Sequence, residues 1–339
     1  MIQEGIGVAV PEQGGELRAV LVPVYENDGL ERLIVESPPG IRIVKAVGGQ
    51  ELKEHLPAAD ILISNNLVYE RDIAEIVRRE GRRLKWIAFS TSGIDKAVKH
   101  GLPPNVLITN ATGVKAPTVA EHGIFLLLNL FRQMRQIEMA RKARRWARHE
   151  LNTQIRSLED AHLVVVGYGA IGQQIARKAK AFDMKVSVVS RAAQCGEHVD
   201  AVYPRGRIEE VFSCADAVIV ASKLDETTFH MLGKDQIAAL PRHAVVVNVS
   251  RGGLIDEMAL IAALKDGKIA AAALDVMEVE PLSVDSPLWS MENVLVSPHV
   301  AGCGNDGYAR FSQLFAENLR RFRANQPLLN LLRAPSAEG

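Results

Sequence analysis

Three ionisable residues in the last part of the chain each follow a buried, strand-like run. Arg251, Glu280 and His299 all come within a few residues of the end of such a run. In open parallel sheets, ligands bind in the crevice outside the carboxyl ends of the strands. We therefore expect these three side chains on one ligand-binding edge of a sheet. The runs that precede them span residues 244–249, 271–276 and 294–296.

These side-chain types suit the reduction of a 2-oxo acid, which delivers a hydride to the carbonyl carbon and a proton to its oxygen. His299 can give that proton near neutral pH. Glu280 can orient the imidazole and favour its charged form, and Arg251 can hold the substrate carboxylate and polarise the carbonyl. Taken singly, each residue also has a non-catalytic interpretation: Arg251 as a solvated loop residue, Glu280 as an exposed acid, and His299 as a capping residue. Their joint placement favours catalysis.

A glycine-rich turn follows the strand-like run 163–166 and leads into a helical pattern. Its first glycine suits a tight turn, its second lets the backbone approach a pyrophosphate, and its third lets helix and strand pack closely. The helix N-terminus adds free N–H groups and a positive dipole end. A turn without a ligand is the alternative, but the flanking strand and helix favour dinucleotide binding. The turn consists of Gly167, Tyr168, Gly169, Ala170, Ile171 and Gly172.

The residues after the next strand-like run, 185–189, bear on the choice of cofactor. An NAD site usually has Asp or Glu here, about 20 residues after the glycines, to hold the ribose hydroxyls. This chain has Ser190 and Arg191 instead. A guanidinium binds phosphate through a planar fork of donors. We expect NADP, with NAD as the alternative if Arg191 is an ordinary surface residue.

The chain alternates strand-like and helical patterns twice, which predicts parallel sheets in two α/β domains. A long helix is expected from Ala116 through residue 143, and an amphipathic helix at 308–323 is expected to return to the first domain. The predicted fold is thus two Rossmann-like, doubly wound parallel-sheet domains with the active site in the cleft between them. Residues 1–116 and 304–339 would form a discontinuous substrate-binding domain, and residues 117–303 the dinucleotide-binding domain. The strand-like runs of the first part are 19–24, 41–47, 60–64, 85–89 and 106–109.

Composition narrows the classes of partner and location. Forty basic residues balance forty acidic ones, so net charge gives no reason to expect nucleic acid or an anionic membrane. The three cysteines, Cys195, Cys214 and Cys303, form no CxxC pair and suggest free thiols in a reducing compartment, with no metal site. The first residues lack the pattern of a signal peptide. We expect a soluble, cytoplasmic protein.

Several stretches of the chain resemble the D-isomer-specific 2-hydroxyacid dehydrogenases, in particular the glyoxylate/hydroxypyruvate reductase branch. The resemblance implies Arg251, Glu280 and His299 as the catalytic set, and Asp275 as a contact of the nicotinamide carboxamide. It also implies that the backbone amides of Ser92 and Gly93, in STSGID, take the substrate carboxylate. The stretches that carry it are AEHGIFLLL, VVVGYGAIGQQIA, VVVNVSRGGLIDEMALIAALKDGKIAAAALDVMEVEPL and SPHVAG.

Departures from the family pattern narrow the substrate. Around ILISNNLV there is no arginine of the kind that phosphoglycerate-type members use for a phosphorylated substrate. Formate dehydrogenases resembling this family carry an amide where this chain has Glu280. The loop ASKLDETT lacks the usual proline, which leaves its cofactor contacts open. We expect a small 2-oxo or 2-hydroxy acid of the glyoxylate, hydroxypyruvate or pyruvate class.

Two further expectations concern the class of protein and its assembly. A dinucleotide-sensing binding protein, similar to the corepressors that share this fold, is the alternative to an enzyme. The basic run 141–148 is weak support for nucleic-acid binding, because such runs are usually solvated helix faces. The apolar stretch 124–131 and the polar segment after residue 143 favour a homodimer built on the cofactor domain.

Overall fold

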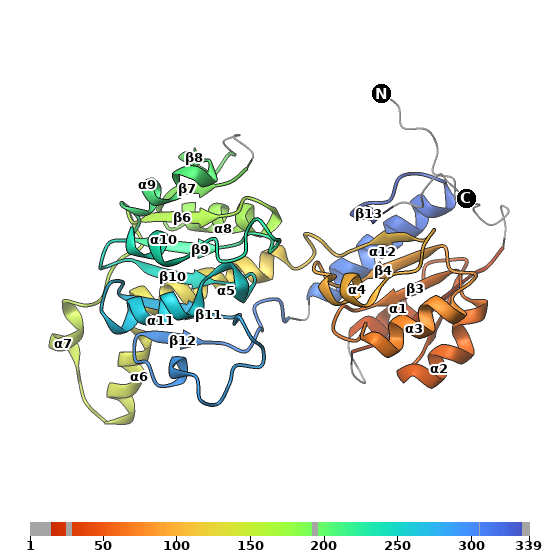
Figure 1. Ribbon diagram of the computed structural model, residues 1–339, viewed down its shortest axis with the longest axis horizontal. Helices are drawn as coiled ribbons and strands as arrows, with labels where there is room; N and C mark the ends of the chain where they lie inside the picture. The colour runs from red at the N-terminus through yellow and green to blue at the C-terminus, as the bar shows by residue number, and fades with distance from the viewer. Residues whose placement is uncertain (1–14, 25–28, 192–195, 305, 334–339) are drawn as a thin grey trace. The chain divides into compact units, whose positions relative to one another are not determined.

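The computed structural model describes residues 15–24, 29–191, 196–304 and 306–333. The chain divides into two compact units. The first comprises residues 1–115 with 304–339, and the second comprises residues 116–303. Each unit is built around its own β-sheet. Figure 1 shows both sheets, with the chain coloured from red at its N-terminus to blue at its C-terminus. The prediction of two parallel-sheet α/β domains is confirmed.

The described part of the first unit contains a six-stranded sheet in the order β13-β5-β4-β3-β1-β2. Five strands pair in parallel, and β13 runs antiparallel to β5 at one edge. That edge strand was not predicted, because three residues after the last helix are too short to show a periodic pattern. The strands are β1 (Leu17–Leu21), β2 (Ile41–Lys45), β3 (Ile61–Ser64), β4 (Trp86–Phe89), β5 (Leu107–Thr109) and β13 (Leu331–Arg333).

Helices cover both faces of the first sheet. One apolar layer joins the strands to α1 and α12, and a second joins them to α2, α3 and α4. Trp86 belongs to the first layer, where its ring stacks on Phe315 of α12 with centroids 5.2 Å apart and its Nε1–H donates to Thr109. The helices are α1 (Arg32–Val35), α2 (Gly48–His55), α3 (Arg71–Glu80), α4 (Asp95–His100) and α12 (Asp306–Arg323).

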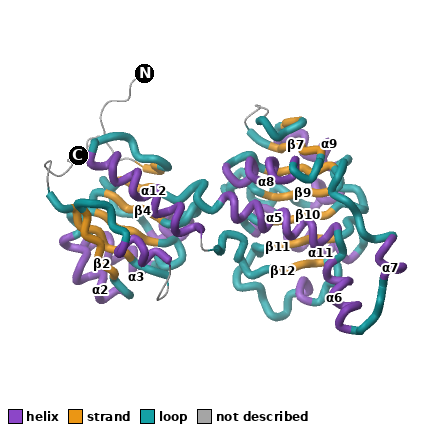
Figure 2. The backbone as a smooth tube through the Cα atoms, turned by 180° about the vertical axis from the view of Figure 1, so that it is seen from behind, coloured by secondary structure: helices purple, strands orange, loops and turns teal. Residues whose placement is uncertain are grey.

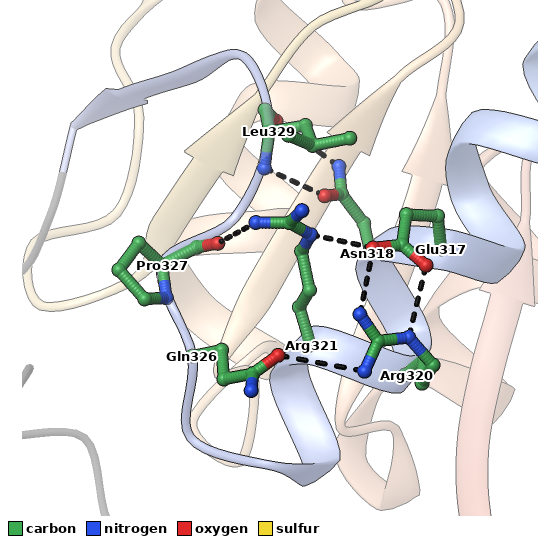
Figure 3. A network of polar contacts seen from close by, with 7 residues as sticks. All are labelled: Glu317, Asn318, Arg320, Arg321, Gln326, Pro327 and Leu329. Atoms are coloured by element: carbon green, nitrogen blue, oxygen red, sulfur yellow. Dashed lines mark hydrogen bonds and ion pairs between the residues drawn. The ribbon is translucent and has the colours of Figure 1, made fainter.

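Polar contacts fasten α12 to the chain that follows it (Figure 3). Glu317 accepts hydrogen bonds from Arg320 and Arg321, and these lower the pKa of its carboxyl to about 2. The next residue, Asn318, exchanges two hydrogen bonds with the backbone of Leu329. The segment leading to β13 is thereby tied to the helix, and the C-terminal part of the chain completes the first unit.

The described part of the second unit contains a seven-stranded sheet in the order β12-β11-β10-β9-β6-β7-β8, with parallel pairing throughout. Its central strands are rich in valine and alanine because helices bury both faces. The short edge strand β8 was not predicted. The strands are β6 (His162–Val166), β7 (Lys185–Val189), β8 (Ala201–Tyr203), β9 (Ala217–Val220), β10 (Val245–Asn248), β11 (Ala271–Leu274) and β12 (Val294–Val296).

The strand order and the helix layers make the second unit doubly wound. Apolar residues of α5 and α8 form the core on one face of the sheet, and those of α9, α10 and α11 form it on the other. Figure 2 shows α5 and α8 side by side across the strands, in agreement with their packing. The helices are α5 (Ala116–Phe131), α8 (Ala170–Lys180), α9 (Ile208–Phe212), α10 (Lys234–Ala238) and α11 (Glu257–Lys265).

The single long helix expected from residue 116 to 143 is wrong, because the chain breaks it in two. Gln133 adopts a left-handed conformation, with φ of 54°, between α5 and α6 (Met134–Lys142). Just past this break, the Arg135 guanidinium donates to the carbonyls of Met291 and Val294, which anchors the new helix direction. The polar segment beyond it contains the short helix α7 (Arg148–Asn152), and both views show α6 and α7 projecting beyond the sheet.

The structure bears on two of the predictions made from composition. Cys214 and Cys303 are free and exposed, whereas Cys195 lies outside the described residues. Over the described ranges, every helix is too short or too polar to cross a membrane.

The stacking of Trp86 on α12 predicts how strongly the returning helix stabilises the first unit. Trp86→Ala should lower the free energy of unfolding of that unit by about 3–5 kcal/mol in a urea titration, because it leaves a cavity and an unpaired Thr109 hydroxyl. Trp289→Ala is the matched control, since that ring is half exposed and belongs to the second unit. Equal transitions for the two variants would contradict the proposed packing.

Candidate active site

The second sheet brings the three ionisable residues to one edge. Arg251, Glu280 and His299 follow β10, β11 and β12, and these strands are neighbours in the order β12-β11-β10. All three strands are parallel, so their carboxyl ends meet at the same edge. The chain segments that follow them therefore start side by side, which is the placement that the sequence predicted.

Glu280 and His299 form a direct ion pair. The distance from His299 Nδ1 to Glu280 Oε2 is 2.8 Å, and the other carboxylate oxygen accepts the backbone N–H of Met277 at 3.1 Å. A carboxylate only accepts, so Nδ1 carries the hydrogen of this bond. This contact orients the ring and leaves Nε2 as the nitrogen turned away from Glu280. Both side chains are partly exposed, as a group that exchanges protons with a substrate must be.

The charges around Glu280 keep it ionised. Burial raises the pKa of its carboxyl, but the hydrogen bonds from His299 and Met277 and the positive charges of His299 and Arg251 lower it to below the usual value. Arg251 is thus within electrostatic reach of the pair. Its backbone is held by Asn248, whose side-chain amide donates to the Arg251 carbonyl at 3.0 Å.

Asp275, at the end of β11, organises the turn that carries His299. Its carboxylate is 1% exposed and accepts the backbone N–H groups of Val300 at 3.0 Å and Ala301 at 2.9 Å. Its own carbonyl accepts the N–H of His299 at 2.8 Å. The predicted contact between Asp275 and a carboxamide stays a prediction, whereas the contacts that the structure shows are with the turn.

Two residues that the sequence analysis did not single out complete this arrangement. Ser297 donates to Asp275 Oδ1 at 2.6 Å, and His122 of α5 lies next to both. His122 is the histidine of the quoted stretch AEHGIFLLL. It was overlooked because its partners lie more than 150 residues away along the chain.

The glycine turn has the geometry that a dinucleotide phosphate requires. Gly167 has φ of +101°, and a Cβ on it would lie 2.7 Å from the backbone of Ser222. A Cβ on Gly172 would lie 2.0 Å from the Gly167 carbonyl, so the helix can approach the strand only without one. Gly169, the N-cap of α8, instead faces open space, with no atom of the described residues within 4 Å of such a Cβ. The turn therefore leaves open space at the N-terminus of α8, where backbone N–H groups can bind an anion.

Ser190 and Arg191 lie at the carboxyl end of β7, with the backbone N–H of Ser190 bonded to the Tyr203 carbonyl of β8. Arg191 is exposed. The pKa of the Asp225 carboxyl, in the loop after β9, is lower than usual. A hydrogen bond from Thr227 is the main cause, and the positive charge of Arg191 is a smaller one. The position that would repel a ribose phosphate in an NAD site is therefore occupied by a hydroxyl and a cation.

In the first unit, the loop with Ser92 and Gly93 follows β4. The Ser92 carbonyl accepts from Asn110 at 2.5 Å, and the Gly93 carbonyl accepts from Thr91 at 2.9 Å. Among the described residues, no hydrogen bond is donated by the backbone N–H of Ser92 or Gly93. The Ser92 hydroxyl also donates to the Ala111 carbonyl, so the loop is held by its carbonyls and this hydroxyl, and its backbone amides suit an anion.

Comparison with known proteins agrees with this geometry. Residues 124–301 match the family model of the D-isomer specific 2-hydroxyacid dehydrogenase, NAD binding domain. A glyoxylate reductase of Korarchaeum cryptofilum is 29% identical over 95% of this chain and 93% of its own length. A D-3-phosphoglycerate dehydrogenase of Methanocaldococcus jannaschii is 30% identical over 89% of this chain, which spans only 57% of that relative.

A solved structure gives the same result for the fold. The D-isomer specific 2-hydroxyacid dehydrogenase of Xanthobacter autotrophicus Py2, in complex with NADPH and MES, is 28% identical. It superposes with a TM-score of 0.80, over 93% of this chain and 98% of that one. The family resemblance predicted from the sequence is confirmed: the chain belongs to the D-isomer-specific 2-hydroxyacid dehydrogenases and is an oxidoreductase.

Proposed function

We propose that this chain reduces a small 2-oxo acid, of the glyoxylate, hydroxypyruvate or pyruvate class, with NADPH, and catalyses the reverse oxidation. The observation that carries the proposal is the ion pair of His299 with Glu280, at 2.8 Å, on a sheet edge that it shares with Arg251. This edge is where a doubly wound sheet binds its ligands.

The residues divide the work of the reaction between them. The Arg251 guanidinium holds the substrate carboxylate and draws electron density from the 2-carbonyl. In this proposal the amides of Ser92 and Gly93 would also bind the carboxylate, and Asp275 would hold the cofactor's carboxamide. A reduced nicotinamide bound there would supply the hydride to the carbonyl carbon. His299 gives the proton from Nε2 to the carbonyl oxygen, and Glu280 stabilises the imidazolium beforehand.

The cofactor site is assigned to the glycine turn and the end of β7. Gly169 allows the close approach of a pyrophosphate, while Gly167 and Gly172 allow the tight turn and the close packing of helix on strand. Tyr168, Ala170 and Ile171 form the rest of the turn. Ser190 and Arg191 would hold the 2′-phosphate of NADP(H). The NADPH complex of the Xanthobacter relative supports a phosphorylated cofactor, and the family includes NAD users as well.

A homodimer is the proposed assembly. Phe125 of α5 and Met139 of α6 are 56% and 49% exposed, and Trp146, just before α7, is 90% exposed. Met139 and Trp146 lie on the arm formed by α6 and α7, and exposed large apolar side chains are typical of a contact surface between protein chains. We assign this arm, on the proposed cofactor domain, to the interface between two copies of the chain.

The proton-donor role of His299 predicts a loss of turnover without a loss of cofactor. His299→Asn should keep its affinity for NADPH and lower kcat about 10²–10⁴-fold, the usual contribution of general acid–base catalysis. His55→Asn, on α2 of the first unit, is the control and should leave kcat unchanged. Normal turnover in the His299 variant would remove His299 from this role.

The pairing of Glu280 with His299 predicts a change in the pH profile. The pKa of Glu280 is below its usual value, so the carboxylate persists as pH falls, and the acid limb of wild-type kcat/KM should lie below the ordinary glutamate range. Glu280→Gln removes this limb. It also removes the charge that stabilises the imidazolium, so the alkaline limb should move to lower pH. A profile identical to that of the wild type would contradict this coupling.

The residues at the end of β7 predict the cofactor preference. Arg191 can add charge-assisted hydrogen bonds to a 2′-phosphate, so we expect roughly ten- to hundredfold higher kcat/KM with NADPH than with NADH at this exposed edge. Arg191→Ala should raise KM for NADPH and barely change it for NADH. Adding Ser190→Asp should invert the preference, because a carboxylate repels the phosphate.

The control for this prediction is Arg82→Ala, an exposed arginine of the first unit that should affect neither cofactor. An equal effect of Arg191→Ala on both cofactors, or a wild-type preference for NADH, would overturn the NADP assignment.

A further inference from the structure

His122, in the second turn of α5, contacts two residues at the far end of the same unit. Its Nε2 lies 3.1 Å from Ser297 Oγ and 3.4 Å from Asp275 Oδ1. Ser297 Oγ in turn lies 2.6 Å from Asp275 Oδ1. These contacts join α5, the first helix of the second unit, to the carboxyl ends of β11 and β12, its last two strands.

The direction of these hydrogen bonds follows from the number of hydrogens. The Asp275 carboxylate only accepts, and the Ser297 hydroxyl has one hydrogen, which the 2.6 Å contact directs to Asp275. Ser297 can therefore only accept from His122, and Nε2 must carry a hydrogen. The result is a chain of donors that runs from His122 through Ser297 to Asp275.

These hydrogen bonds stabilise the buried charge of Asp275, and Asp275 holds the turn that contains His299. Asp275 is 1% exposed, and a buried carboxylate is costly unless several donors compensate it. Two of its donors are the N–H groups of Val300 and Ala301. His299 between Ser297 and these residues has φ of +54°, an uncommon conformation for a residue with a side chain. The turn therefore depends on Asp275 to hold it.

We propose that His122 is a positioning residue for the reaction. It acts through Ser297 and Asp275, keeping the turn at 298–301 in the conformation that places the His299 imidazole against Glu280. The inference rests on the proposed function, because it takes His299 to be the proton donor. A residue of α5 would thus determine the geometry of the turn at 298–301, at the other end of the same unit.

The kinetic test compares two replacements of His122. His122→Leu removes the donor, and we expect kcat to fall about ten- to hundredfold while the Kd for NADPH changes less than the turnover, as when a supporting contact of a reacting group is lost. His122→Gln keeps an N–H donor of similar reach, and should restore kcat to within about threefold of the wild type.

The structural test uses the protein without cofactor or substrate. In His122→Leu, amide hydrogen exchange at His299, Val300 and Ala301 should be about tenfold faster or more, since their acceptor Asp275 is less well held. Exchange in β6 and β9, in the middle of the same sheet, should not change. His122→Gln should retain most of the protection.

His162 provides a matched control. It forms a histidine–serine pair of the same chemistry, with Nε2 2.8 Å from Ser187 Oγ, at another place in the same sheet. His162→Leu should leave both kcat and the exchange at 299–301 unchanged. If His122→Leu behaves like His162→Leu in both measurements, then His122 has only a general structural role and the proposal is overturned.

The two proposals fail in different ways. Should His299→Asn turn over normally, the proposed function is wrong, whereas the exchange rates at 299–301 still report whether His122 holds the turn. Should the exchange rates and kcat be insensitive to His122→Leu while His299→Asn is inactive, only the positioning role is lost.

Discussion

Asp275 keeps a carboxylate inside the second unit, where an unpaired charge would cost several kcal/mol. The structure meets that requirement with a serine hydroxyl and the backbone amides of the turn after β12. The same contacts hold His299 in a left-handed conformation beside Glu280. The need to compensate one buried charge thus determines where the proposed proton donor lies.

The doubly wound sheet supplies the second constraint. Its parallel order β12-β11-β10 brings three separate chain segments to one edge, so residues as far apart in sequence as Arg251 and His299 follow neighbouring strands there. The glycine turn lies at the same end of β6, with Gly167 in a backbone conformation that a side chain would strain. One set of strand ends can therefore serve both a dinucleotide and the acid that it reduces.

The sequence predicted those features that local patterns encode. Strand-like runs and the glycine spacing located the candidate catalytic and phosphate-binding residues. It did not predict the helix break at Gln133, because the apolar pattern of α5 continues into α6 and the carbonyls that anchor Arg135 are more than 150 residues away. His122 and Ser297 escaped notice for the same reason, since their importance comes from contacts made only in the folded chain.

A crystal structure with NADPH and oxamate, an unreactive analogue of a 2-oxo acid, would test the account most directly. We expect the oxamate carboxylate to be bound by Arg251 and the amides of Ser92 and Gly93. His299 Nε2 should lie within hydrogen-bonding distance, about 2.6–3.2 Å, of the oxygen that corresponds to the substrate carbonyl. An analogue bound elsewhere, or bound with that oxygen turned away from His299, would contradict the proposed mechanism.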